Sequence, residues 1–500
     1  MNYPEPAPSA GRWLALYVLC FGALMIVLDT TIVGVALPSI RTDLGFSKAS
    51  LAWVVNAYLL TFGGFLLLGG RLGDLFGHRR LFVGGITLFT LASLGCGLAS
   101  SQGLLIGARA VQGAGGAVVE AAALSLVIML FTEPAERAKA IGVYGFVAAG
   151  GGSIGVLLGG VVTNSLDWHW IFLVNVPIGV LVFALSLGLV PTGRGNPASG
   201  RLDIAGALTI STSVMIAVYA IVNGNEHGWT SGRTLWLLGA AAVLLVGFLA
   251  VEARVGAPLV PLGLFRLRNV ATANVIGVLW AAAMFAWFFL TALYLQLVLG
   301  YTPLQVGLAF LPGNLIMGAF SLGLSAKLVV RLGIKPPLVT GLLLAAAGLA
   351  LFVRAPVGGS FASDVLPSMI LLGLGAGLAL NPVLLAAMSD VAPEESGLAS
   401  GIVNSSFMMG GALGLAVLAS LAAARTDHLL ASGDGRLAAL TGGYHVAFLV
   451  AAVFAAGAAT LGAALLAGRH AGTEGGDEAD SVPACSGPGR AIPLLEGGSE

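Results

Sequence analysis

The sequence predicts an all-α integral membrane protein with about fourteen transmembrane helices. Apolar residues make up 57% of its 500 residues and charged residues only 9%, whereas soluble domains carry about 25% charged residues. Apolar runs of roughly 17–28 residues recur along the whole chain, with polar breaks between them, and runs of this length can cross a hydrocarbon core ~30 Å thick. Composition and periodicity therefore both exclude a large soluble core.

The spans follow from hydropathy, and their even number places both termini on one side of the membrane. Most Lys and Arg residues of the breaks lie on the side of the N-terminus, which predicts that both termini are cytoplasmic. The predicted spans are 13–37, 50–70, 82–100, 103–130, 139–162, 170–190, 204–222, 234–251, 270–299, 304–326, 337–353, 365–388, 396–423 and 443–467.

A long break precedes the last six spans and divides the chain. The first apolar run is too long for the core of a signal peptide, so we interpret it as a retained span. The predicted parts are a cytoplasmic N-terminus (1–12), a six-helix bundle (13–190), two additional helices with their loops (191–251), a cytoplasmic loop (252–269), a second six-helix bundle (270–467) and a disordered cytoplasmic tail (468–500).

Several functions are not expected. The formal net charge is zero, so the chain should not attract nucleic acid in bulk. No phosphate-binding Gly-x-x-x-x-Gly-Lys-Ser/Thr motif occurs, and the six histidines lack the spacing of metal ligands. We therefore expect no enzyme activity, no cofactor and no metal.

Three ionisable residues inside apolar spans indicate where the chemistry lies. Arg109 and Glu120 share the predicted span 103–130, and with Gly113 and Gly116 they fall on one helix face. A charge at mid-bilayer costs about 3 kcal/mol on insertion scales, so such residues line cavities or meet partners. We interpret this face as part of an ion or substrate path.

Depth favours a partnership between Arg109 and the third residue, Asp29. At 1.5 Å per residue Asp29 lies ~23 Å along its span, and Arg109 lies ~21 Å from the same face. Asp29 is then either half of a structural ion pair or a carboxylate that exchanges a proton with the substrate. Glu120 is ~16 Å from Arg109 along the helix. It either lies near the inner interface or serves as a second proton site or a contact for a cationic substrate.

Motifs add to this interpretation. A glycine turn with an acid and a basic cluster follows the second span, at Gly70, Asp74, Gly77, Arg79 and Arg80. This spacing resembles the signature loop of the major facilitator superfamily. The resemblance implies a fold of two six-helix bundles plus two extra helices, and a conformational latch at Asp74. From physics alone the loop is equally an inner loop anchored by positive charge.

Two further stretches resemble the fourteen-spanner drug–proton antiporters of that superfamily. The stretch from Leu28 to Pro38, which contains Asp29, resembles their first-span motif. The stretch from Arg109 to Gly115, with Gln112 and Gly113, resembles their fourth-span motif, whose Arg is linked to proton coupling. The resemblance implies that Asp29, Arg109 and Glu120 serve proton coupling.

A glycine series follows the spacing of the antiporter motif in the fifth span. From physics, glycines four residues apart form a stripe that lets another helix pack closely. The resemblance implies a hinge and seal between the two halves. Val156 replaces a proline of the motif, which leaves the direction of transport open. The series is Gly142, Gly151, Gly155, Gly159 and Gly160.

The sequence thus predicts proton-coupled efflux of hydrophobic or amphipathic drugs or antibiotics by alternating access. The alternatives are a dedicated exporter of one metabolite or antibiotic, a proton-coupled uptake symporter, and a non-transporting receptor. The expected partners are a small-molecule substrate, protons and the lipid bilayer of a bacterial cytoplasmic membrane, without nucleic acid, and the expected state is a monomer. Aromatic residues of the span 270–299 either line a drug cavity or pack.

Overall fold

The computed structural model describes residues 9–47, 50–191, 204–255, 258–391 and 396–466, and the regular elements in these ranges are all helices. Within these ranges, twelve helices are long and apolar enough to cross a membrane, and two shorter apolar stretches accompany them: Ile154–Ser165, which is the end of a longer helix, and Pro303–Ala319. The prediction of an all-helical membrane fold with about fourteen spans is confirmed. The predicted tail lies outside the described residues.

The elements follow the predicted spans closely. They are α1 (Ser9–Leu44), η1 (Ser50–Ala52), α2 (Trp53–Phe76), α3 (His78–Gly97), α4 (Gln102–Leu130), α5 (Pro134–Ser165), α6 (Trp170–Leu173), α7 (Asn175–Leu189), α8 (Ile204–His227), α9 (Gly232–Glu252), η3 (Leu262–Arg266), α10 (Arg268–Leu297), α11 (Pro303–Ala319), η4 (Phe320–Leu324), α12 (Ser325–Leu332), α13 (Lys335–Phe352), η5 (Phe361–Val365), α14 (Leu366–Met388), α15 (Ser396–Ala431) and α16 (Arg436–Leu465).

Two predicted breaks are wrong in extent. The break predicted at 424–442 is helical except for a short turn, because α15 runs to Ala431 and Gly433 turns the chain with φ +92°. The glycine turn predicted at 69–80 is also mostly helical, because α2 continues to Phe76 and only Gly77, with φ +93°, interrupts it. The equivalent position after α12 is Gly333, with φ +81°. Glycine reaches such angles without the strain that a side chain would cause.

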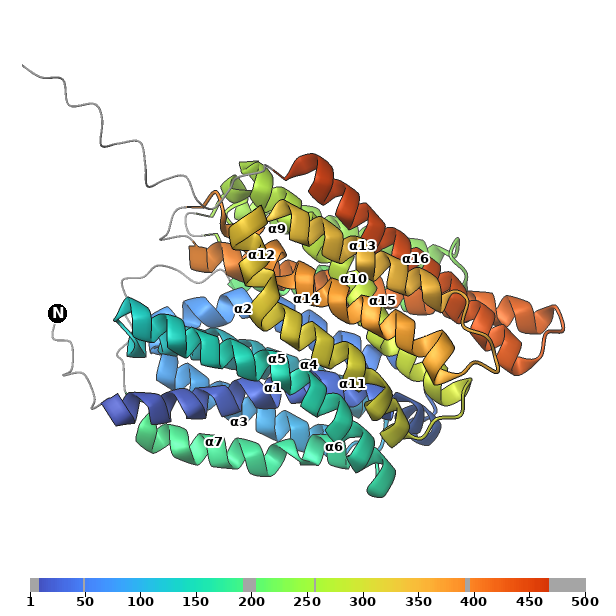
Figure 1. The fold of residues 1–500 in the computed structure, drawn as a ribbon, viewed down its shortest axis with the longest axis horizontal. Coiled ribbons are helices and arrows are strands. Elements are labelled where there is room, and N and C mark those ends of the chain that lie inside the picture. The colour runs from blue at the N-terminus through green and yellow to red at the C-terminus, as the bar shows by residue number, and fades with distance from the viewer. Residues whose placement is uncertain (1–8, 48–49, 192–203, 256–257, 392–395, 467–500) are drawn as a thin grey trace, which may run out of the picture.

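The helices pack in two groups. Helices α1 to α7 contact one another, and so do helices α10 to α16, while the hairpin α8–α9 lies against α2 and α15. Figure 1 shows both groups side by side, with the blue and teal helices below and the yellow, orange and red ones above. We call the end of the bundle where α1 begins the terminal end, and the other the opposite end.

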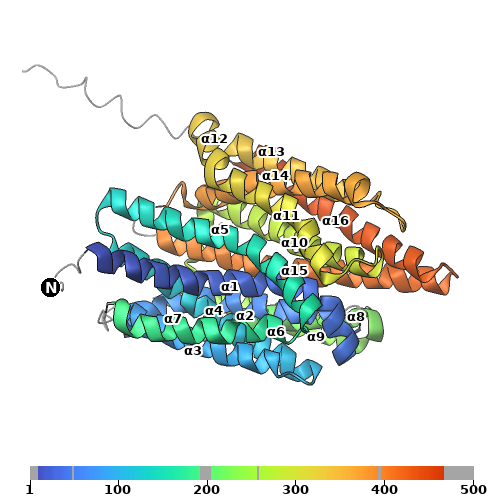
Figure 2. The same ribbon diagram turned by 60° about the horizontal axis from the view of Figure 1, so that its bottom comes forward.

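Helices α5 and α11 join the two groups at the opposite end. They meet near the end of α5 and the start of α11, and they diverge toward the terminal end (Figures 1 and 2). There the α10 residue Gln296 also donates a hydrogen bond across the groups, from Nε2 to the carbonyl oxygen of Val35 at 2.9 Å. The opposite end is therefore closed in this structure.

Candidate functional site

Asp29 and Arg109 meet at the centre of the α1–α7 group, out of contact with solvent. The Arg109 Nη1 lies 2.5 Å from the Asp29 Oδ2, and Arg109 is 1% and Asp29 0% exposed. The depth estimate from sequence therefore placed them correctly. Desolvating two charges is repaid only where geometry is good and the remaining hydrogen-bonding groups are satisfied.

Polar neighbours from two helices, α4 and α7, satisfy the rest of the Asp29 carboxylate. Its Oδ1 accepts hydrogen bonds from Gln112 Nε2 at 2.7 Å and from Asn175 Nδ2 at 3.0 Å. The same two amides donate to Ser93 Oγ, each at 3.1 Å. Ser93 in turn donates to the Phe172 carbonyl oxygen at 2.9 Å. These bonds hold Asp29 as an acceptor of three hydrogen bonds.

Arg109 is held equally firmly. Its Nε donates to the Val54 carbonyl oxygen at 3.0 Å and its Nη1 to Gln112 Oε1 at 2.8 Å. The guanidinium also lies over two aromatic rings, 4.4 Å from the centroid of Tyr58 and 5.6 Å from that of Phe172. A desolvated cation gains about 2 kcal/mol from such a ring.

Two members of this network were missed from sequence. They are Asn175 of α7 and Ser93 of α3. The available signal was an uncharged polar residue inside or at the start of an apolar span, which is a weak signal because Ser and Asn also satisfy themselves within their own helix. Gln112, predicted through the fourth-span motif, lies at the centre of the network.

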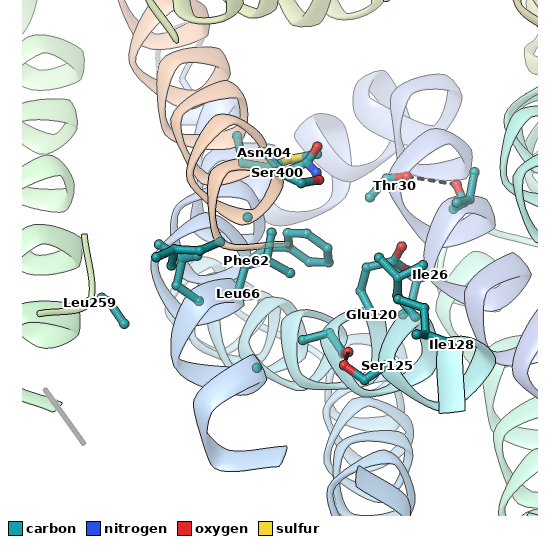
Figure 3. A pocket seen from close by; sticks show the side chains of 18 of the residues that line it. Ile26, Thr30, Phe62, Leu66, Glu120, Ser125, Ile128, Leu259, Ser400 and Asn404 are labelled. Atoms are coloured by element: carbon teal, nitrogen blue, oxygen red, sulfur yellow. Dashed lines mark hydrogen bonds between the residues drawn. The ribbon is translucent and has the colours of Figure 1, made fainter. Parts of the chain in front are cut away.

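A cavity of about 610 Å³ lies between the two groups and reaches the terminal end. Its walls come from α1, α2 and α4 on one side and from α15 on the other, with Leu259 at the rim. Figure 3 shows Glu120 of α4 facing Ser400 and Asn404 of α15. Among the described residues that line the cavity, Glu120 alone is ionisable at neutral pH.

Glu120 is thus separate from the Asp29–Arg109 pair. It has Tyr144 of α5 nearby, and it is partly exposed to the cavity. Asp29 does not line the cavity, although its neighbour Thr30 does. The structure therefore brings two of the three predicted residues together and places the third where a bound molecule would lie.

The aromatic residues of α10 do not line this cavity. Trp280 and Trp287 are fully buried, as are Phe289 and Tyr294, within the core of the α10–α16 group. Phe285 packs against Phe407 of α15 with ring centroids 6.1 Å apart. Of the two interpretations of these aromatic residues, packing within the protein agrees with the structure and lining of the drug cavity does not.

The predicted latch loop lies at the terminal end. Gly70 lines the cavity. Arg79 donates from Nε to the Ser186 carbonyl oxygen at 3.4 Å and also to that of Leu187, so it stabilises the last turn of α7 within its own group. Arg80 is exposed. The surroundings of the Asp74 side chain lie outside the described part of the structure, so the latch stays a prediction.

The glycines of α5 have two different neighbours. A Cβ on Gly151, Gly155 or Gly159 would meet α1, and that on Gly159 would lie 2.7 Å from the Ile32 carbonyl oxygen. Gly160 instead faces α11, where its Cβ would lie 2.7 Å from the Pro303 carbonyl oxygen. The first three glycines therefore let α5 approach the helix that carries Asp29. Gly142 lies outside the described surroundings.

Gly160 and Gly307 form the reciprocal contact that closes the opposite end. A Cβ on Gly307 would lie 3.0 Å from the Val156 carbonyl oxygen, so both glycines face backbone that cannot yield. We expect Gly160→Ala to weaken this closure, because overpacking costs about 1–3 kcal/mol. The check is faster labelling by an impermeant maleimide of a cysteine introduced at Gln296. Gly152→Ala is the matched control, since its Cβ would meet only Thr31 Cγ2 at 3.9 Å. Equal labelling in both variants would contradict the expectation.

Paired helical groups, a buried ion pair and a cavity between the groups define a membrane transport protein. The chain belongs to the Major Facilitator Superfamily, whose sequence model matches residues 19–415. The family is one of transporters and not of enzymes. The resemblance predicted from the motifs is confirmed.

The chain is similar to several bacterial proteins named for resistance or export. It is 40% identical over 460 residues to the puromycin resistance protein pur8 of Streptomyces alboniger, covering 92% of this chain and 91% of that protein. It is 39% identical to the cephamycin export protein CmcT of Amycolatopsis lactamdurans, covering 88% and 90%. It is 38% identical to the multidrug resistance protein Stp of Mycobacterium tuberculosis, covering 82% and 76%.

Solved structures agree on the fold. A bacterial homolog of the human lysosomal transporter Spinster, in an inward-facing and unoccupied conformation, has a TM-score of 0.64 over 91% of this chain and 97% of its own. The same homolog in an occupied conformation has a TM-score of 0.65. The sequence identity is 16% in both cases, so the likeness concerns the fold alone.

Proposed function

We infer that this chain exports drug-like or antibiotic small molecules across a bacterial cell membrane, and we propose that proton antiport drives the export. The names of its relatives support export. The observation that carries the proton part is the Asp29–Arg109 pair, a carboxylate at 0% exposure beside the transport cavity. A charge so expensive to bury is retained in membrane proteins mainly for ion or substrate pathways.

The groups α1–α7 and α10–α16 act as the two rocking halves of an alternating-access cycle, with α8 and α9 as the additional pair. Both termini are cytoplasmic in this proposal, so the terminal end faces the cytoplasm. The cavity then receives substrate from the cytoplasm while Gly160 and Gly307 close the outer end. The protein works as a monomer.

Proton exchange acts on the ion pair. In the outward-facing state Asp29 takes up a proton and loses its attraction to Arg109, which keeps its own charge. In the inward-facing state the proton leaves and the pair reforms, as in the present geometry. Glu120 is a second proton site or a contact for a cationic substrate, and Asp74 with the basic residues of its loop is the latch.

Two alternatives have specific support. A dedicated exporter of one antibiotic is favoured by relatives named for single compounds, puromycin and cephamycin. Proton-coupled uptake is the other alternative, because Val156 replaces the proline of the antiporter motif and so removes one indication of the direction of transport. Both keep the same cavity and differ in selectivity or direction.

Everted membrane vesicles with an acidic interior test the proposal. We expect puromycin or a cephamycin to accumulate in vesicles that contain the chain, and an ionophore that collapses the gradient should abolish the accumulation. Vesicles without the chain are the control. Accumulation in right-side-out vesicles with an acidic exterior would instead establish uptake, and transport of one compound only would establish a dedicated exporter.

A further inference from the structure

The site has two acidic centres with no described ionic contact between them. Asp29 is sealed beside Arg109, whereas Glu120 faces the cavity. Along α4, Arg109 and Glu120 are ~16 Å apart. A proton that reaches the cavity must therefore cross the wall between these centres before it can reach Asp29.

Between the two acidic centres α4 carries glycines, and Tyr58 of α2 packs against α4 where these glycines leave no side chain. A Cβ on Gly113 would lie 3.0 Å from the Tyr58 carbonyl carbon, and a Cβ on Gly116 would lie 2.9 Å from the Tyr58 hydroxyl oxygen. Tyr58 therefore lies along the α4 face from Gly113 toward Gly116, in the direction of Glu120. Side chains at either glycine would push it away.

Tyr58 contacts both sides of the wall. The Arg109 guanidinium lies 4.4 Å from the centroid of the Tyr58 ring, and Tyr58 also lines the cavity. Asp29, Arg109 and Glu120 all act on it electrostatically. Among the described residues, no other cavity-lining side chain has a ring contact with Arg109.

The Tyr58 hydroxyl is buried and has no hydrogen-bond partner among the described residues. Buried polar groups rarely stay unpaired, so an orphaned hydroxyl indicates a partner that is present at another stage of the cycle or a water. Thr30, the other hydroxyl between the cavity and Asp29, already donates to the Val27 carbonyl oxygen at 2.8 Å (Figure 3). The hydroxyl hydrogen of Thr30 is therefore already used in a hydrogen bond, whereas that of Tyr58 has no acceptor among the described residues.

We propose that Tyr58 is the relay through which protons pass between the cavity and Asp29. When a proton moves from the cavity to Asp29, the Tyr58 oxygen accepts it from the Glu120 carboxyl group or from a hydronium ion in the cavity. The O–H bond already on Tyr58 breaks, and its proton forms a new O–H bond on the Asp29 carboxylate, directly or through one water. One proton moves, the tyrosine ends neutral, and release follows the reverse order.

This inference rests on the proposed proton antiport, and Tyr58→Phe in proteoliposomes tests it. The variant keeps the ring on Arg109 and removes only the hydroxyl. With puromycin as the probe, we expect accumulation driven by a pH gradient to fall about tenfold or more, within the range of coupling between two sites. Puromycin exchange without a gradient should fall much less than gradient-driven accumulation, because binding and rocking need no net proton transfer.

Tyr444→Phe is the matched control, because Tyr444 is a buried tyrosine of α16 outside the cavity. Thr30→Val tests the competing hydroxyl. Gradient-driven accumulation at the wild-type level in Tyr58→Phe would overturn the relay, and so would its loss only in Thr30→Val. If exchange falls as much as gradient-driven accumulation in Tyr58→Phe, Tyr58 acts through structure or substrate binding and the relay is also wrong. If the unsubstituted protein exchanges puromycin but shows no accumulation driven by a pH gradient, the proposed antiport itself is wrong, and the relay is wrong with it.

Discussion

Asp29→Asn is expected to reduce gradient-driven transport to the level of vesicles without the chain. The asparagine can still accept hydrogen bonds from Gln112 and Asn175, whose amides lie 2.7 and 3.0 Å from Asp29 Oδ1. It cannot release a proton, so the cycle loses the step that links rocking to the gradient. Exchange of substrate without a gradient should persist.

The matched control for this prediction is Asp43→Asn on the same helix. Asp43 is exposed at the opposite end, where its Oδ2 accepts from Trp168 Nε1 at 3.0 Å, and an asparagine can accept the same bond. It should transport at the wild-type rate. Full gradient-driven flux in Asp29→Asn would show that the ion pair is purely structural.

Arg109→Gln is expected to have the largest effect on stability. Removing one partner of a buried ion pair typically destabilises a protein by about 3–5 kcal/mol, because the other charge stays buried without compensation. Here the Asp29 carboxylate would be left with two amides, and the Tyr58 ring would lose its cation. Unfolding of the purified protein in detergent measures the change.

A double-mutant cycle separates the pair from its surroundings. The double variant Asp29→Asn with Arg109→Gln should recover much of the stability that each single variant loses, since no buried charge is then left unpaired. It should not recover proton-driven transport. Arg425→Gln, a substitution at an exposed arginine of α15, is the control. Strictly additive losses in the double variant would contradict a coupled pair.

Much of the fold could be predicted because the membrane imposes a simple rule on sequence. Backbone groups in hydrocarbon must be satisfied internally, so each apolar run of sufficient length becomes a helix. The spans predicted near 204 and 337 are helical as α8 and α13. The break predicted at 424–442 was wrong because hydropathy registers charges such as Arg425, whereas a helix can continue past the membrane surface.

The candidate site was predictable only where residues were charged. Asp29 and Arg109 could be paired by depth, because a helix advances a constant distance per residue. Ser93 and Asn175 could not be found in this way, since uncharged polar residues are common in helices and their partners Gln112 and Asp29 come from other helices, α4 and α1. Tyr58 had no sequence signal at all, because its role depends on the glycines opposite it in α4.

By itself the sequence determined the class of protein, the order of its helices and the presence of opposite charges at one depth. These properties depend on composition, length and rise per residue, which are local. Only the tertiary structure decided which faces meet: that Gly151, Gly155 and Gly159 pack on α1 while Gly160 faces α11, and that Glu120 lines the cavity while Asp29 does not. The rotation of each helix about its own axis depends on side-chain packing across all its neighbours, and no single stretch of sequence contains that information.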